Sequence, residues 1–71
     1  MTRHFEFVDG NSSKFWEVAV NGKDVTVRFG RIGTSGQTQT KRFDDAAAAQ
    51  KHANKMSQQK ISKGYRELAA K

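Results

Sequence analysis

A chain of 71 residues is about half the length of a typical domain, which excludes two independent hydrophobic cores. The chain has no cysteine, which excludes disulfides, cysteine zinc sites and iron–sulfur clusters. Thirteen Lys and Arg against seven Asp and Glu give a net charge of +6.

The basic residues are concentrated in the second part of the chain. Residues 1–27 carry a net charge of −1, whereas residues 28–71 carry +7. This asymmetry favours a polyanionic partner, with nucleic acid ahead of an anionic membrane surface. No apolar run approaches the roughly 18 residues of a membrane span, and the N-terminus lacks the apolar segment of a signal peptide. We therefore expect a cytoplasmic protein that does not bind membranes, and a nucleoid-associated one if it binds DNA.

Three alternating runs at the start of the chain predict strands. Arg3–Val8 places Phe5 and Phe7 on one face, and the turn residues 9–12 follow. Lys14–Val20 places Trp16 on the same face as two valines, where we expect it in the core. Asn21-Gly22 then predicts a type I′ hairpin turn into a third strand at Val25–Phe29.

The second part of the chain predicts an edge strand, one helix and a short closing segment. Residues 30–36 contain three glycines, and Gln37–Phe43 alternates only weakly, as is typical of an edge strand. Asp45 to about Ser62 predicts a helix that stops at Gly64, and residues 65–69 predict a last segment or strand. One helix face is unusually small, since it carries Ala46, Ala49, Ala53 and Met56 and then Lys60. The fold class is therefore α+β: one two-layer domain over residues 1–71, with an antiparallel sheet of four to five strands and one helix across it.

Four motifs in register resemble those of WGR domains. The stretch 28–37 (Arg-Phe-Gly-Arg-Ile-Gly-Thr-Ser-Gly-Gln) is similar to the Trp-Gly-Arg-(Ile/Val)-Gly signature and its Gly-rich turn, with Phe29 in place of the tryptophan. Residues 11–16 resemble the family's Asn-rich turn before a lysine and two aromatics. The alanines and Met56 resemble its helix, and Lys60 with Gly64-Tyr65 resembles the helix exit.

The resemblance implies a compact, non-catalytic module of sheet and helix. WGR domains occur in DNA-damage-responsive poly(ADP-ribose) polymerases and in bacterial proteins, some labelled molybdate metabolism regulators. In the polymerases the module binds DNA near a break or 5′ end and relays that occupancy to neighbouring domains. Phe29 matches the aromatic residue that packs on the terminal nucleotide, and Arg31 matches the arginine that bridges DNA and a neighbouring domain.

The candidate nucleic-acid site combines the motif with nearby basic residues. It comprises Lys14, Arg28, Phe29, Gly30, Arg31, Lys41 and Arg42. A planar guanidinium between glycines suits phosphate binding, or the glycines serve only the turn. Alternation places Phe29 in the core, whereas its position at a strand end suits stacking on a base or sugar. Arg28, Lys41 and Lys14 share one face of the sheet if the strand register allows it.

No pattern in the sequence indicates catalysis or a cofactor. His4 and His52 lie far apart, without clustered carboxylates, and the serines have no adjacent base. We therefore expect a monomeric non-enzyme without metal or cofactor that docks DNA ends or breaks with little sequence specificity. The alternative is a module that binds another protein domain without contacting DNA.

Overall fold

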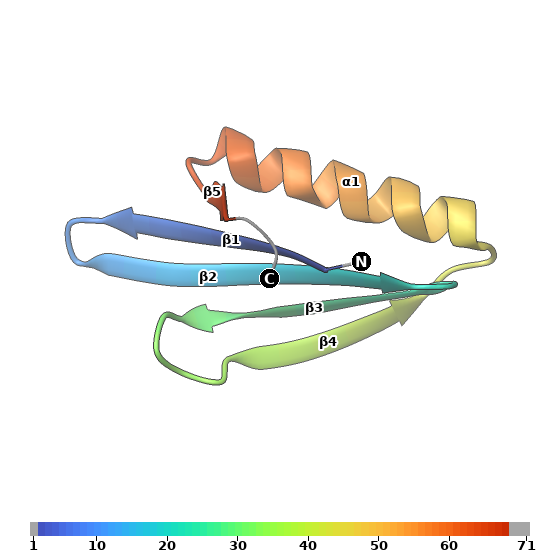
Figure 1. Cartoon of the computed structure of the whole chain (residues 1–71), viewed down its shortest axis with the longest axis horizontal. Helices are drawn as coiled ribbons and strands as arrows, with labels where there is room; N and C mark the ends of the chain where they lie inside the picture. The colour runs from blue at the N-terminus through green and yellow to red at the C-terminus, as the bar shows by residue number, and fades with distance from the viewer. Residues whose placement is uncertain (1, 69–71) are drawn as a thin grey trace.

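The chain folds into one antiparallel sheet with a helix along one face (Figure 1). The structure is a computed structural model that describes residues 2–68. Its elements are β1 (Thr2–Asp9), β2 (Ser12–Asn21), β3 (Asp24–Arg31), β4 (Gln37–Arg42), α1 (Ala46–Ser62) and β5 (Arg66–Leu68). The strand order is β4-β3-β2-β1-β5, which confirms the α+β prediction and the edge position of β4. The predicted closing segment is a strand, and its last residue, Ala69, lies outside the described residues.

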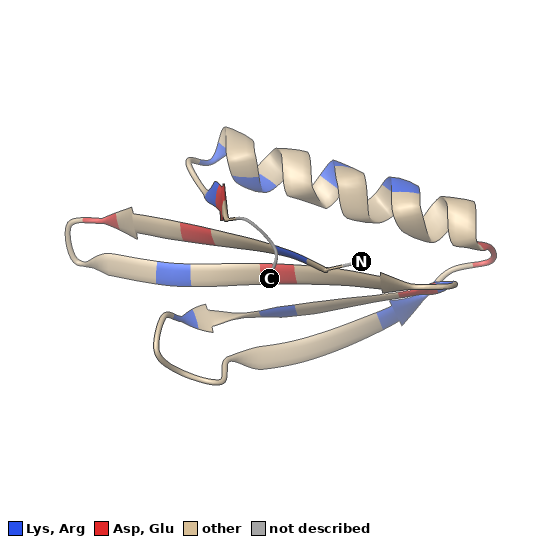
Figure 2. Cartoon of the chain, in the orientation of Figure 1, with Lys and Arg blue, Asp and Glu red and all other residues tan. Residues whose placement is uncertain are grey.

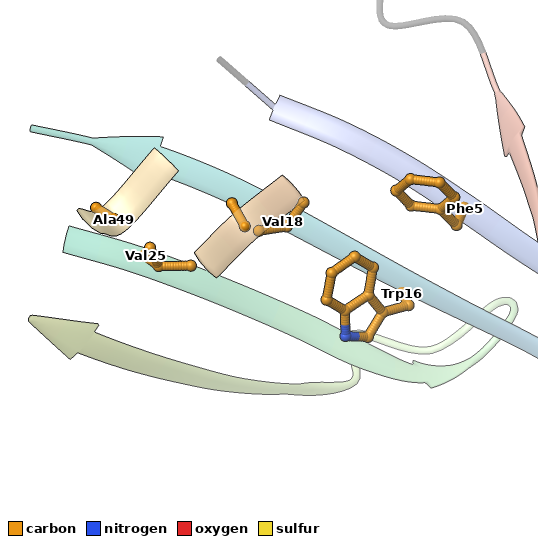
Figure 3. Close-up of a cluster of buried hydrophobic side chains, with 6 residues drawn as sticks. Phe5, Trp16, Val18, Val25 and Ala49 are labelled. Atoms are coloured by element: carbon orange, nitrogen blue, oxygen red, sulfur yellow. The ribbon is translucent and has the colours of Figure 1, made fainter. Parts of the chain in front are cut away.

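The core lies between α1 and the central strands. Phe5 and Trp16 are almost fully buried and supply most of its bulk, as Figure 3 shows. Ala49 and Ala53 face the sheet from the helix, with Ala49 beside Val25, so small side chains let α1 approach the sheet closely. Ala46, predicted on the same face, is exposed at the helix start. Ser57 is buried one turn after Ala53, and its hydroxyl donates to the Ala53 carbonyl at 2.8 Å, which satisfies the buried group.

Local sequence signals fix the ends of the elements. Asp45 caps α1, since its Oδ1 accepts a hydrogen bond from the Ala48 amide at 2.7 Å. Gly64, at φ +101°, ends the helix in the left-handed region. The β2–β3 hairpin is confirmed, but the type I′ assignment is wrong. Asn21 pairs with Asp24, so Gly22 and Lys23 are the central residues, and among the described residues only glycines have positive φ. A positive φ at the first central residue alone is the type II′ pattern.

The second face of the sheet has no helix over it and carries a polar network. Phe15 lies on this face yet is only 5% exposed. The His4 ring stacks 6.0 Å from it, and the Arg28 guanidinium lies 4.8 Å above its centre. Glu17 joins these two covering residues, because it accepts hydrogen bonds from Arg28 Nε and His4 Nδ1, each at 3.0 Å. The single described helix is not long and apolar enough to cross a membrane.

Candidate nucleic-acid interface

An open pocket is lined by residues of the β1–β2 turn, the end of β3 and the last turns of α1. These segments lie at the same end of the molecule (Figure 1). Its volume is about 500 Å³. Three basic residues line it, each from a different element: Lys14 from β2, Arg31 from β3 and Lys60 from α1. The apolar residues that line it include Trp16, Val27, Phe29, Met56 and Tyr65. We call this site the basic pocket.

Strand register brings Lys14 and Arg31 together. The two residues are cross-strand partners. Each lies two positions from an aromatic residue of the helix-covered face, Trp16 and Phe29, so both side chains stand on that face. The Ile32 amide donates to the Ser13 carbonyl at 3.1 Å and continues the pairing past the strand end. The pair is therefore held by backbone pairing, while both side chains remain exposed.

Lys60 reaches the pocket from the helix face that carries the buried alanines. Its Nζ lies 5.4 Å from the centre of the Trp16 ring and 5.3 Å from that of Tyr65. Burial lowers the pKa of Lys60, and the positive charges of Lys63 and Lys14 lower it further. Sequence reasoning did not place Lys60 in the site, although a charge on an apolar helix face was the available signal.

The basic pocket lacks a negative counterpart. Among residues 2–68, no carboxylate lies within ion-pair distance of Lys14, Arg31 or Lys60. Other basic residues are paired, as Arg3 is to Glu67 at 2.7 Å and Arg28 to Glu17 at 3.0 Å. Figure 2 shows the basic residues on both the sheet and α1. The pocket therefore brings three unpaired cations together, although lysines elsewhere on the described chain also lack a carboxylate partner.

Phe29 and Gly30 form the wall of the pocket beside Arg31. Phe29 is half-buried: it packs against the core, as alternation predicts, and its remaining surface lines the pocket. A Cβ at Gly30 would lie 2.8 Å from the Gly36 Cα, and one at Gly36 would lie 2.5 Å from the Phe29 carbonyl oxygen. Gly36 also has φ +72°. The glycines thus serve the turn, by letting the loop after β3 fold back against the strand.

The predicted stripe of Lys14, Arg28 and Lys41 on one face is wrong. Arg28 alternates with Phe29 and lies on the face opposite Lys14. Its guanidinium pairs with Glu17 and donates to the Ser35 carbonyl at 2.9 Å, so it holds the network and the loop. Lys41 stands on the helix-covered face, but beside Val25 at the far end of β3. Arg42 is exposed, 3.9 Å from Asp24, and does not line the basic pocket.

The histidines and carboxylates of the described chain do not form a metal site. Among the described residues, no three His, Cys, Asp or Glu side chains lie together as a metal site would require. His4 is bound into the network of the open face, and the His52 ring packs 4.8 Å from that of Phe43. The arrangement can bind an anion at the basic pocket by charge and hydrogen bonding.

Comparison with known proteins matches the chain to one domain family and to two bacterial relatives. The family model described as the WGR domain matches residues 1–71. Escherichia coli K12 protein YehF is 45% identical over 67 residues, which cover 94% of this chain and 24% of that protein. The uncharacterized protein YfeS of the same strain is 37% identical over 67 residues, 94% of this chain and 28% of its own length.

A solved structure agrees with these matches. The crystal structure of a Bacteroides fragilis protein superimposes with a TM-score of 0.94 at 48% identity, over 97% of this chain and 20% of that one. The chain thus spans about a quarter of the length of the curated relatives it matches. Only the WGR model is found, and no catalytic domain is evident. The chain belongs to the WGR domain family.

Proposed function

We propose that this domain binds DNA without catalysing a reaction, and that it docks duplex ends or breaks through phosphate contacts with little sequence specificity. The observation that carries the proposal is the basic pocket, where Lys14, Arg31 and Lys60 have no carboxylate partner among residues 2–68. A phosphate supplies the missing negative charge. The Arg31 guanidinium suits two phosphate oxygens at once, and the two ammonium groups add charge without fixed geometry.

The exposed part of the Phe29 ring favours the end of a duplex, rather than its interior, as the ligand. Phe29 keeps part of its ring surface at the pocket, next to Arg31. A duplex end exposes the flat face of a terminal base and its sugar, whereas interior bases are stacked on both sides. The position of Phe29 also matches that of the stacking aromatic residue in the WGR signature. Because phosphate contacts carry no sequence information, we expect weak sequence preference.

An NMR titration of the isotope-labelled domain tests this function. The ligand is a short duplex with a 5′-phosphorylated open end, and the control is a capped hairpin with the same number of phosphates, both at physiological salt. We expect shifts at residues 29–33 and at Lys14, and tighter binding of the open end. Arg31→Ala should weaken binding more than Lys51→Ala, which removes the same charge from an exposed helix position. Equal losses would show that only total charge matters, and unshifted spectra with both DNAs would reject the function.

The edge strand favours a second candidate, a module that binds another protein domain. All six residues of β4 are exposed, and β3 is its neighbour on one side only. Such an edge can pair with an extended segment of a partner. A partner retained in a pull-down at high salt and after nuclease treatment would support this candidate. Loss of all partners with nuclease would count against it.

A further inference from the structure

The basic pocket continues into a groove between α1 and β4. A second pocket, of about 150 Å³, lies between Val25, Lys41 and His52 and shares Val27, Gln39 and Met56 with the first. The groove exists because α1 packs on β2, β3 and β5. A helix about 10 Å wide covers about two strands spaced roughly 4.8 Å apart, so the helix-side surface of β4 stays open.

Basic residues lie at the two ends of this groove, and apolar residues lie between them. Lys14, Arg31 and Lys60 stand at one end, and Lys41 stands at the other. Between them the floor is apolar at Val27 and Met56. No acidic residue of the described chain lines either pocket.

The length of the groove follows from the strand register. Lys41 pairs with Val25, and Arg31 lies six residues further along β3. At about 3.3 Å per residue, the two positions are about 20 Å apart.

We propose that the groove between α1 and β4 receives a single-stranded overhang that continues from the DNA end held in the basic pocket. This inference rests on the proposed function. An unpaired strand presents phosphates and flat apolar bases along one line, which matches cations at both ends of an apolar floor. A duplex keeps its bases paired inside and offers the groove only phosphates. At about 3.4 Å per stacked nucleotide, 20 Å accommodates about six nucleotides, and fewer if the strand is extended.

Gln39 is the residue of the groove best placed to contact a base edge. It lines both pockets, and its side chain is exposed on β4. A side-chain amide both donates and accepts hydrogen bonds, as base edges do. Gln39 therefore adds a polar contact to the apolar floor midway between the two groups of cations.

Fluorescence anisotropy with three 5′-phosphorylated DNAs tests the groove. The DNAs are a blunt duplex and duplexes with a six-nucleotide 5′ or 3′ overhang, all with the same total number of phosphates. We expect one overhang to bind about fivefold more tightly than the blunt duplex. Lys41→Ala should remove most of that advantage and weaken blunt binding no more than Lys51→Ala does, and the retained blunt binding also shows that the variant is folded. Gln39→Ala should reduce the advantage in the same way, and the control Lys51→Ala should weaken all three DNAs equally.

The outcomes separate this inference from the function on which it rests. Equal binding of all three DNAs, or equal effects of Lys41→Ala and Lys51→Ala, would overturn the groove and leave end docking intact. Absence of binding to every DNA would overturn both. In a parallel NMR titration, the methyl signals of Val25, which lines only the second pocket, should shift with the preferred overhang and not with the blunt duplex. A Val25 shift with a hexaglutamate peptide alone would assign the groove to acidic peptides and reject the overhang.

Discussion

The Lys60 ammonium is partly buried and lies close to other cations, which makes its charged form unusually costly. Its lowered pKa has a direct consequence for anion binding. A bound phosphate stabilises the charged amine, so binding should raise this pKa toward its ordinary value. Affinity should accordingly fall as pH rises through the lowered pKa of the free domain. The carbon-13 shift of Lys60 Cε, titrated with and without a 5′-phosphorylated duplex, measures both pKa values.

Lys60→Arg is the matched variant for this prediction, because a guanidinium stays charged throughout the range. In this variant, DNA affinity should no longer fall as pH rises through the lowered pKa of Lys60. An identical decline in both proteins, or a Lys60 pKa that DNA leaves unchanged, would show that Lys60 does not contact the anion.

On the open face of the sheet, Glu17 is the residue whose protonation should most reduce the stability of the fold. Its pKa is lowered, first because Arg28 donates a hydrogen bond to it and then because His4 does, although partial burial opposes the shift. A carboxyl with a lowered folded pKa adds stability above its unfolded pKa of about 4.3, and that stability is lost as pH falls through the folded value. Glu17→Gln should therefore cost about 1 kcal/mol at neutral pH and less in acid. Urea unfolding at several pH values measures this, with exposed Asp9→Asn as the control.

At the scale of the element, α1 depends on small side chains where it meets the sheet. Ala49 is fully buried and Ala53 nearly so. Three added carbons at Ala49 would push the helix away from Val25 and the other strand residues beneath it. Ala49→Leu should lower the free energy of unfolding by about 1–3 kcal/mol, and Ala47→Leu, on the exposed side, should change it little. Chemical denaturation compares the two, and equal stabilities would contradict close packing at Ala49.

The elements followed from the sequence because their signals are local. Alternation located β1, β2 and β3 to within two residues at each end, and Asp45 and Gly64 marked the helix ends. The arrangement across strands was harder to predict, since a single sequence does not give the register. The grouping of Arg28 with Lys14 failed for this reason: only the pairing of Lys14 with Arg31 shows which cations meet. Lys60 and Gln39 were missed as site residues because α1 and β4 are brought to the pocket by the tertiary fold.

On the scale of the whole molecule, the net charge of +6 is not spread evenly over the surface. Acidic side chains pair with Arg3 on β1 and with Arg28 on the open face. The basic pocket keeps its cations unpaired within the described chain, and Lys51 and Lys55 lie exposed on α1. Counterion release therefore offers a way to count which cations contact phosphate, because distant charges steer DNA without neutralising it.

Each phosphate contact on duplex DNA adds about −0.9 to the slope of log affinity against log salt. Contacts from Lys14, Arg31 and Lys60 should together give a slope of about −3 with a blunt 5′-phosphorylated duplex. Arg31→Ala should reduce its magnitude by about 1, whereas Lys51→Ala should lower affinity slightly at every salt concentration and keep the slope. Anisotropy titrations from low to physiological salt measure these slopes. A slope near −6 would mean that about six or seven phosphates are contacted, so that cations outside the basic pocket also bind DNA. An unchanged slope for Arg31→Ala would remove the basic pocket from the interface.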